Sequence, residues 1–110
     1  IFRAYEYYLH KILGEKMQLS TENDNGTNNF SFFSRKTDGS YECNSSSRNV
    51  LSADQLDYLN TLYTTYNSVR HPFSHWSASD VDVAVITEME EARNYLLDAF
   101  ALIERYYILF

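Results

Sequence analysis

The sequence is poor in the residues that usually break or cross-link a small protein. Its 110 residues include one proline, three glycines and one cysteine. Because Cys43 has no second cysteine to pair with, the chain can form no internal disulfide bond, and we expect a reducing, cytosolic setting. The sequence also lacks a glycine-rich phosphate loop and internal repeats. These absences argue against a disulfide scaffold and against a P-loop enzyme.

Positive charge is also scarce. The formal net charge is −6 and the sequence pI is near 4.9, which argues against a broad surface that holds nucleic acid through its phosphates but leaves a local site open. The sequence has no long uncharged hydrophobic run. The apolar tail over residues 96–110 carries Asp98, Glu104 and Arg105, so we expect no membrane span.

Aromatic residues, in contrast, are abundant. Ten tyrosines and seven phenylalanines, within a hydrophobic fraction of 45%, predict one packed domain over residues 1–110. They exceed the needs of a core of this size, so we expect some of them on a surface that pairs two copies of the chain. The sequence begins at Ile1 without a methionine, and we expect it to be part of a longer protein.

Apolar periodicity predicts helices near residues 1–17, 52–70 and 87–109, and hence a mainly α fold, a small helical bundle. Capping boxes, Ser52 with Gln55 and Thr87 with Glu90, open the second and third helices. Pro72 should end the second helix near Arg70, because proline disfavours helical geometry in the preceding residue and lacks an amide hydrogen.

A long polar insertion over residues 18–50 separates the first two helices. It is rich in Asn, Ser, Thr and Gly, and insertions of this length usually mark function or mobility. Within it, the run NFSFFSRKTDGSYEC can pair as a short β-hairpin about the Asp38-Gly39 turn.

The stretch SVRHPFSHW, residues 68–76, concentrates Arg70, His71 and His75 around the single proline. One interpretation is structural: Arg70 caps the end of a helix, where a cation is favoured, and the histidines are incidental. The other is chemical, because histidine can act as acid or base at neutral pH and arginine grips a phosphate through its planar fork. Spacing alone leaves both interpretations open.

The order Arg70-His71-Pro72-Phe73-Ser74-His75 resembles the Arg-x(4–6)-His signature of HEPN-superfamily ribonucleases, in which a polar residue follows the arginine, as His71 does here. The opening FRAYEYYLHKIL is similar to the first helix of the HEPN domain in RNase LS-type toxins of bacterial toxin–antitoxin systems. That resemblance makes Glu6 the counterpart of a functional glutamate. It also implies a HEPN-like bundle at the C-terminus of a multidomain toxin.

The resemblance implies a metal-independent endoribonuclease without a cofactor, in which Arg70, His75 and Glu6 are catalytic. We expect His71, Asn67 and Ser74 to contact the RNA substrate, and Tyr66 to lie near them. One histidine cannot easily serve as acid and base on opposite sides of one phosphorus, so the family's homodimer, with two Arg/His pairs in one cleft, is expected here. An antitoxin protein or a phage-encoded inhibitor is the expected protein partner. The alternative is a non-catalytic helical dimerisation or protein-interaction domain, in which Arg70 and His75 are structural.

Overall fold

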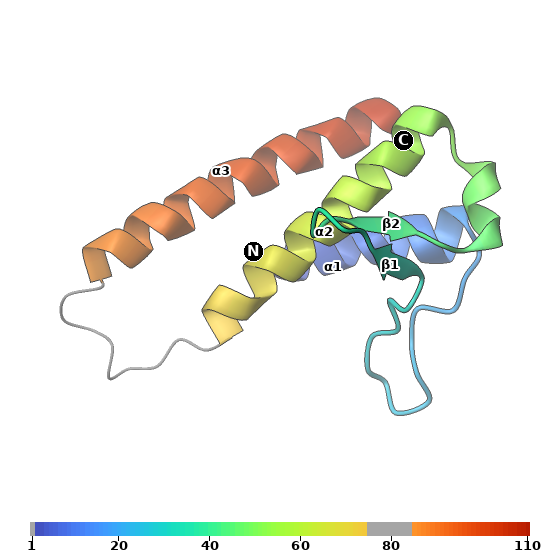
Figure 1. Ribbon diagram of the computed structural model, residues 1–110, viewed down its shortest axis with the longest axis horizontal. Helices are drawn as coiled ribbons and strands as arrows, with labels where there is room; N and C mark the ends of the chain where they lie inside the picture. Colours follow the sequence, from blue (N-terminus) through green and yellow to red (C-terminus); the bar gives the residue numbers. More distant parts are fainter. Residues whose placement is uncertain (1, 75–84) are drawn as a thin grey trace.

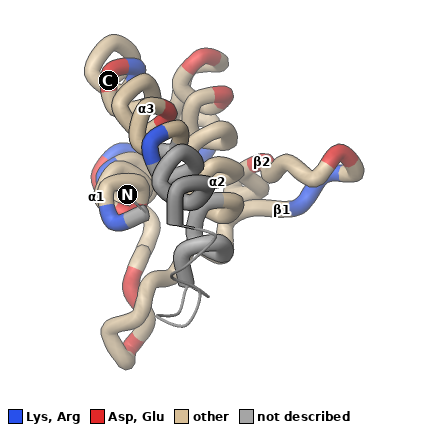
Figure 2. Tube along the Cα trace, turned by 90° about the vertical axis from the view of Figure 1, so that its left-hand side faces the viewer, with Lys and Arg blue, Asp and Glu red and all other residues tan. Residues whose placement is uncertain are grey.

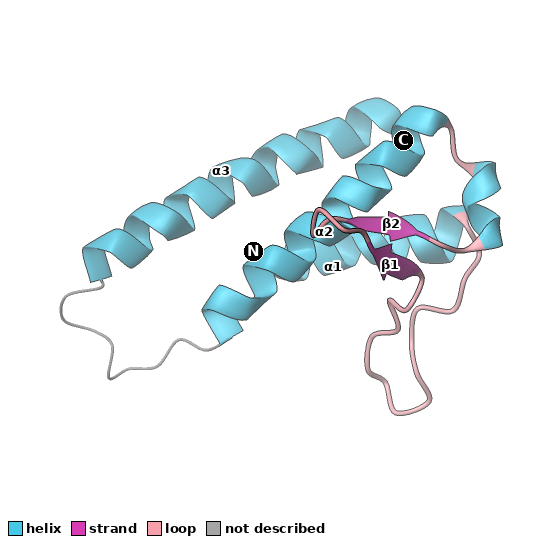
Figure 3. Ribbon diagram, viewed as in Figure 1, coloured by secondary structure: helices cyan, strands magenta, loops and turns pink. Residues whose placement is uncertain are grey.

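The computed structural model describes residues 2–74 and 85–110 of the chain. Its elements follow in the order α1 (Phe2–His10), the π-helix η1 (Lys11–Lys16), β1 (Phe33–Arg35), β2 (Tyr41–Cys43), the 3₁₀-helix η2 (Ser46–Val50), α2 (Ala53–Ser74) and α3 (Val85–Leu109). Three α-helices dominate, and a two-stranded sheet lies between the first and the second along the chain (Figures 1 and 3). The predicted mainly α class is confirmed.

The first predicted helix is present, but its second half is a π-helix. The backbone amide of Met17 donates to the carbonyl of Ile12, five residues earlier, over 3.0 Å. The π-helix continues the buried face of α1, since Ile12 and Leu13 are both fully buried. The π-helix ends at Lys16, and Gln18 follows with a positive φ of 57°.

The start of α2 follows the predicted capping box. The amide of Gln55 donates to the hydroxyl of Ser52 over 3.1 Å, and the amide of Ser52 donates to the side-chain oxygen of Gln55 over 3.0 Å. The second predicted box is wrong, because α3 begins at Val85, so Thr87 lies inside the helix and is not its cap. Apolar periodicity fixes the body of a helix better than its first turn.

The predicted hairpin is confirmed. Strands β1 and β2 are antiparallel, with Phe33 opposite Cys43 and Arg35 opposite Tyr41. Gly39 has a φ of 88° at the turn, where the absence of a side chain matters. The Asp38 carboxylate accepts hydrogen bonds from the amide and the hydroxyl of Ser40. The hairpin lies against α2 (Figure 1), so part of the polar insertion belongs to the folded body.

The core lies where α1 and α3 pack against α2, and η1 extends it beyond the end of α1. Its buried members are Tyr5, Tyr8, Leu9, Ile12, Leu13, Met17, Cys43, Tyr58, Leu59, Leu62, Tyr66, Ala99, Leu102 and Tyr106. Four of the five tyrosines among them come from α1 or α2. Half of the ten tyrosines of the sequence therefore lie in the core. Within the described residues, no helix is both long and apolar enough to cross a membrane.

Candidate functional site

The arginine-histidine stretch lies at the C-terminal end of α2. Contrary to the sequence prediction, the helix does not stop near Arg70 but runs through Pro72 to Ser74. The proline forfeits one hydrogen bond, to the carbonyl four residues earlier, and only two residues of helix follow it, so the penalty falls on the last turn alone. Arg70, His71 and Ser74 therefore occupy one helix. Their side chains, and His75 altogether, lie outside the described residues.

Glu6 lies at the seam between α1 and α2. One carboxylate oxygen accepts a hydrogen bond from the hydroxyl of Tyr66 over 3.2 Å, and the other lies 3.5 Å from a guanidinium nitrogen of Arg3. The Glu6 side chain is only 13% exposed, whereas Arg3 is 83% exposed. Glu6 is thus held in a defined position by α2 and presents one face to an exposed arginine.

Tyr66 connects this seam to the arginine-histidine stretch. Its ring is buried, at 4% exposure, and Arg70 follows four positions later on α2, which is the next position along the same side of a helix. Sequence reasoning placed Tyr66 near the site, and the structure brings it onto Glu6. The backbone thus aligns Glu6, Tyr66 and the position of Arg70 along one edge of α2.

The polar insertion contacts this edge through Phe30. The Phe30 ring lies 5.8 Å from Tyr66, nearly perpendicular to it, and 4.9 Å from the ring of His10. His10 in turn makes hydrogen bonds with Thr21 over 2.8 Å and with Asn28 over 3.0 Å. The insertion is therefore tied to α1 by polar contacts and reaches the seam through one aromatic ring.

Asn67 points toward the hairpin. Its side-chain amide donates to the hydroxyl of Tyr41 over 3.1 Å. This bond gives Asn67 a structural role between α2 and β2, and its predicted contact with substrate stays a prediction, as do those of His71 and Ser74.

Sequence reasoning missed Arg3. The spacing could have revealed it, because residues three apart on a helix are neighbours and opposite charges at that spacing attract. Arg3 and Glu6 form such a pair at 3.5 Å. The α1 side of the seam therefore carries an exposed guanidinium, that of Arg3.

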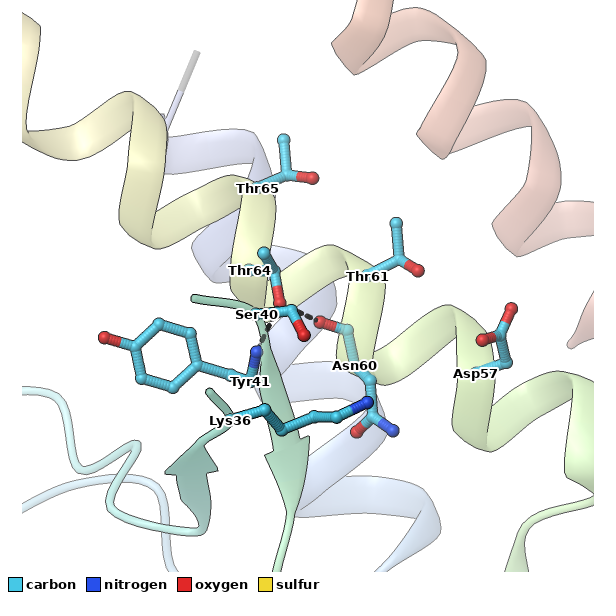
Figure 4. A pocket seen from close by; sticks show the side chains of 8 residues that line it. All are labelled: Lys36, Ser40, Tyr41, Asp57, Asn60, Thr61, Thr64 and Thr65. Carbon is cyan, nitrogen blue, oxygen red and sulfur yellow. Dashed lines mark hydrogen bonds between the residues drawn. The ribbon is translucent and has the colours of Figure 1, made fainter. Parts of the chain in front are cut away.

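A shallow hollow of about 210 Å³ lies elsewhere, between the hairpin turn and α2 (Figure 4). It is lined by Lys36, Ser40, Tyr41, Asp57, Asn60, Thr61, Thr64 and Thr65. None of the predicted site residues is among these, and its two charged side chains have opposite signs, so the hollow is not the predicted RNA site.

The charge distribution of the described residues fits a local rather than a broad anionic-ligand site. Acidic and basic residues are interspersed along the described chain, and both occur at the hairpin turn (Figure 2). Among the described residues there is no group of three or more His, Cys, Asp or Glu side chains arranged to hold a metal ion.

These features define a small helical domain with a glutamate-arginine pair beside the end of its central helix. Residues 1–77 match the model of the family described as RNase LS, bacterial toxin DBD domain. The chain belongs to this family, which confirms the resemblance to RNase LS-type toxins. The match includes the hairpin, α2 and all predicted site residues, and it ends before α3. No curated protein and no solved structure matches the chain.

Proposed function

We propose that this chain is a HEPN-type endoribonuclease domain of a toxin–antitoxin toxin, which cleaves RNA without a metal ion. The observation that carries the proposal is the Glu6 carboxylate, which Tyr66 and Arg3 hold beside the helix that bears Arg70. Membership of the RNase LS toxin family supports the same reaction class. An enzyme of this kind acts on RNA in the cytoplasm and is restrained by an antitoxin.

The chemistry requires a base, an acid and cations. In the proposed reaction, the His75 imidazole accepts the proton of a ribose 2′-hydroxyl, and the resulting oxygen attacks the adjacent phosphorus. The bond from phosphorus to the 5′-oxygen breaks, and that oxygen takes a proton from His75 of a second copy. The products are a 2′,3′-cyclic phosphate and a 5′-hydroxyl, and the two histidines have exchanged protonation states.

The guanidinium groups stabilise the charge that develops on the phosphorane oxygens. Arg70 contacts the phosphate through its planar fork, and Arg3 adds a second fork from α1. Glu6 keeps Arg3 in place across 3.5 Å. This gives the predicted catalytic glutamate a definite task in orienting a phosphate-binding arginine.

The test is RNA cleavage by variants of the intact protein. His75→Ala should lower the cleavage rate at least about 100-fold, because it removes proton transfer. Arg70→Lys should lower it by about 100-fold, since an ammonium keeps the charge but loses the fork. Glu6→Gln should lower the rate roughly 10- to 100-fold, the equivalent of one hydrogen bond to a charged group. Cleavage should persist in EDTA and leave 2′,3′-cyclic phosphate ends.

Matched surface variants provide the controls. Arg48→Lys changes an exposed arginine on η2 whose guanidinium donates to the carbonyl of Ser45, just before that helix. Glu15→Gln changes an exposed glutamate paired with Lys11. Both should cleave RNA at the wild-type rate, and circular dichroism should show equal helix content in all variants. Wild-type cleavage by His75→Ala, or a strict need for Mg²⁺, would refute the proposal.

A non-catalytic interaction domain is the second candidate. The apolar side chains left exposed along α3 favour it, since such a surface suits a protein partner. It predicts no RNA cleavage by the intact protein under any metal condition.

A further inference from the structure

Helix α3 has two apolar sides, and the described residues of the chain cover only one of them. The inner side places Ala99, Leu102 and Tyr106 in the core. The outer side exposes large hydrophobic side chains: Leu96 at 43%, Leu97 at 55%, Phe100 at 57%, Tyr107 at 68% and Ile108 at 80%. Figure 1 shows α3 as the outermost helix, with one long side directed away from α1 and α2.

The exposed residues form one continuous surface, which we call the outer face of α3. At about 100° per residue, Leu96, Phe100 and Tyr107 fall in one row, and Leu97, Ala101 and Ile108 fall in the next. Two charged residues interrupt the surface: Arg93 on one side of the apolar residues 96–101 and Glu104 on the other. Both are exposed, and neither forms an ion pair within the described part of the chain.

The size of the outer face suits a protein interface. Its five large apolar side chains, with Tyr7 of α1 at 54% exposure, expose on the order of 700 Å², close to the roughly 800 Å² per partner of a standard stable interface. Tyr7 belongs to the same surface, because it packs edge-on against Tyr8, and Tyr8 bonds to the hydroxyl of Tyr107 over 3.0 Å.

We propose that the outer face of α3 binds the same face of a second copy, with the two helices antiparallel about a two-fold axis near residues 98 and 99. In that register Leu97 of one copy meets Phe100 of the other, and Leu96 meets Ala101. Arg93 of each copy lies opposite Glu104 of the other, so the two-fold axis makes the pair twice.

The charge pattern selects this arrangement. A parallel pairing in register would bring Glu104 against Glu104 and Arg93 against Arg93, and like charges facing each other are costly. The antiparallel register converts both repulsions into attractions. It also places opposite charges at the contact between two chains that each carry a net charge of −6.

This interface is distinct from the proposed catalytic cleft. The end of α2 and the start of α3 lie at the same end of the molecule (Figure 1), and α3 has 25 residues, a length of about 37 Å. An antiparallel pair of α3 helices holds the Arg70 ends of the two copies far apart. The inference therefore stands independently of the ribonuclease proposal, and both interfaces together would build an assembly larger than a dimer.

Charge reversal in the intact protein tests the pairing. Sedimentation across a range of concentrations should show self-association, which Arg93→Glu or Glu104→Arg alone weakens at least about tenfold. Combining both substitutions should return the dissociation constant to within about threefold of wild type, because the pair is rebuilt with reversed signs. Phe100→Glu should abolish this step of association, and Arg48→Glu should leave it unchanged.

Two outcomes overturn the proposal. One is an association step that Phe100→Glu does not affect, which would assign self-association to another surface. The other is a double variant that stays as weak as the single variants, which would remove the antiparallel register. A protein that stays monomeric at high micromolar concentration would also refute it and would leave the outer face to a different partner, such as an antitoxin.

Discussion

The two long sides of α2 contact their neighbours by different physical means. The side facing α1 and α3 buries Leu59, Leu62 and Tyr66. The side facing the hairpin stacks one ring, Tyr63 on Phe33, and adds hydrogen bonds to the strand backbone. The Asn60 side chain accepts from the amide of Cys43 over 2.8 Å, and the Thr64 hydroxyl accepts from the amide of Tyr41 over 3.0 Å. One side of α2 therefore packs through buried apolar side chains, and the other also binds the strand β2 through hydrogen bonds.

This difference explains why only one side was visible in the sequence. Leucines and tyrosines at helical spacing predict a buried face. Asparagine and threonine at the same spacing are instead typical of a solvated face. Their partners are backbone amides of β2, more than a dozen residues away, and no local pattern encodes that pairing. The hairpin itself was predictable because the Asp-Gly turn is a local signal.

The apolar side should carry the larger share of stability. Leu62 is 1% exposed, so Leu62→Ala should lower the free energy of unfolding by about 2–5 kcal/mol through lost burial and a residual cavity. Urea unfolding followed by circular dichroism measures this. Leu97→Ala on the outer face of α3, measured at a concentration where the protein is monomeric, is the control and should cost less than about 1 kcal/mol. Equal losses would contradict the division between the core and the outer face.

The polar side should matter less to global stability and more to the hairpin. Asn60→Ala leaves the Cys43 amide without its acceptor, so it should cost about 1–3 kcal/mol. Hydrogen exchange should accelerate first over residues 33–43. Thr61→Val is the matched control: Thr61 lines the same hollow, and no hydrogen bond of its side chain occurs among the described residues. If both variants exchange alike, the hairpin is held by its apolar contacts instead.

The candidate site shows the same limit of sequence reasoning. Its residues, Glu6 among them, were located by resemblance and by composition. The bond from Tyr66 to Glu6 spans 60 residues of sequence, so only the packing of α1 on α2 reveals it. The error at Pro72 has a different origin: proline disfavours a helix locally, but a long helix tolerates one lost hydrogen bond in its last turn.

Two buried tyrosines, Tyr5 of α1 and Tyr58 of α2, extend the comparison within the core. Both Tyr5 and Tyr58 are completely buried. The Tyr58 hydroxyl donates to the carbonyl of Leu102 over 2.8 Å, whereas the Tyr5 hydroxyl has no hydrogen-bond partner among the described residues. Burial, with a smaller effect of the Asp98 charge, raises the pKa of Tyr5 to about 12, because an ionised phenol is poorly solvated there.

The smallest expected effect is the difference in the free energy of unfolding between Tyr58→Phe and Tyr5→Phe. Tyr58→Phe should destabilise the protein by about 1 kcal/mol, since it removes a hydrogen bond and leaves the Leu102 carbonyl without that donor. Tyr5→Phe should be neutral or stabilising, because it removes a hydroxyl that is buried without a partner. Paired urea unfolding curves at neutral pH, where both phenols are protonated, measure the difference. If Tyr5→Phe lowers the free energy of unfolding as much as Tyr58→Phe does, the Tyr5 hydroxyl has a hydrogen-bond partner in solution. The core between α1 and α2 then contains a polar contact that the described residues do not provide.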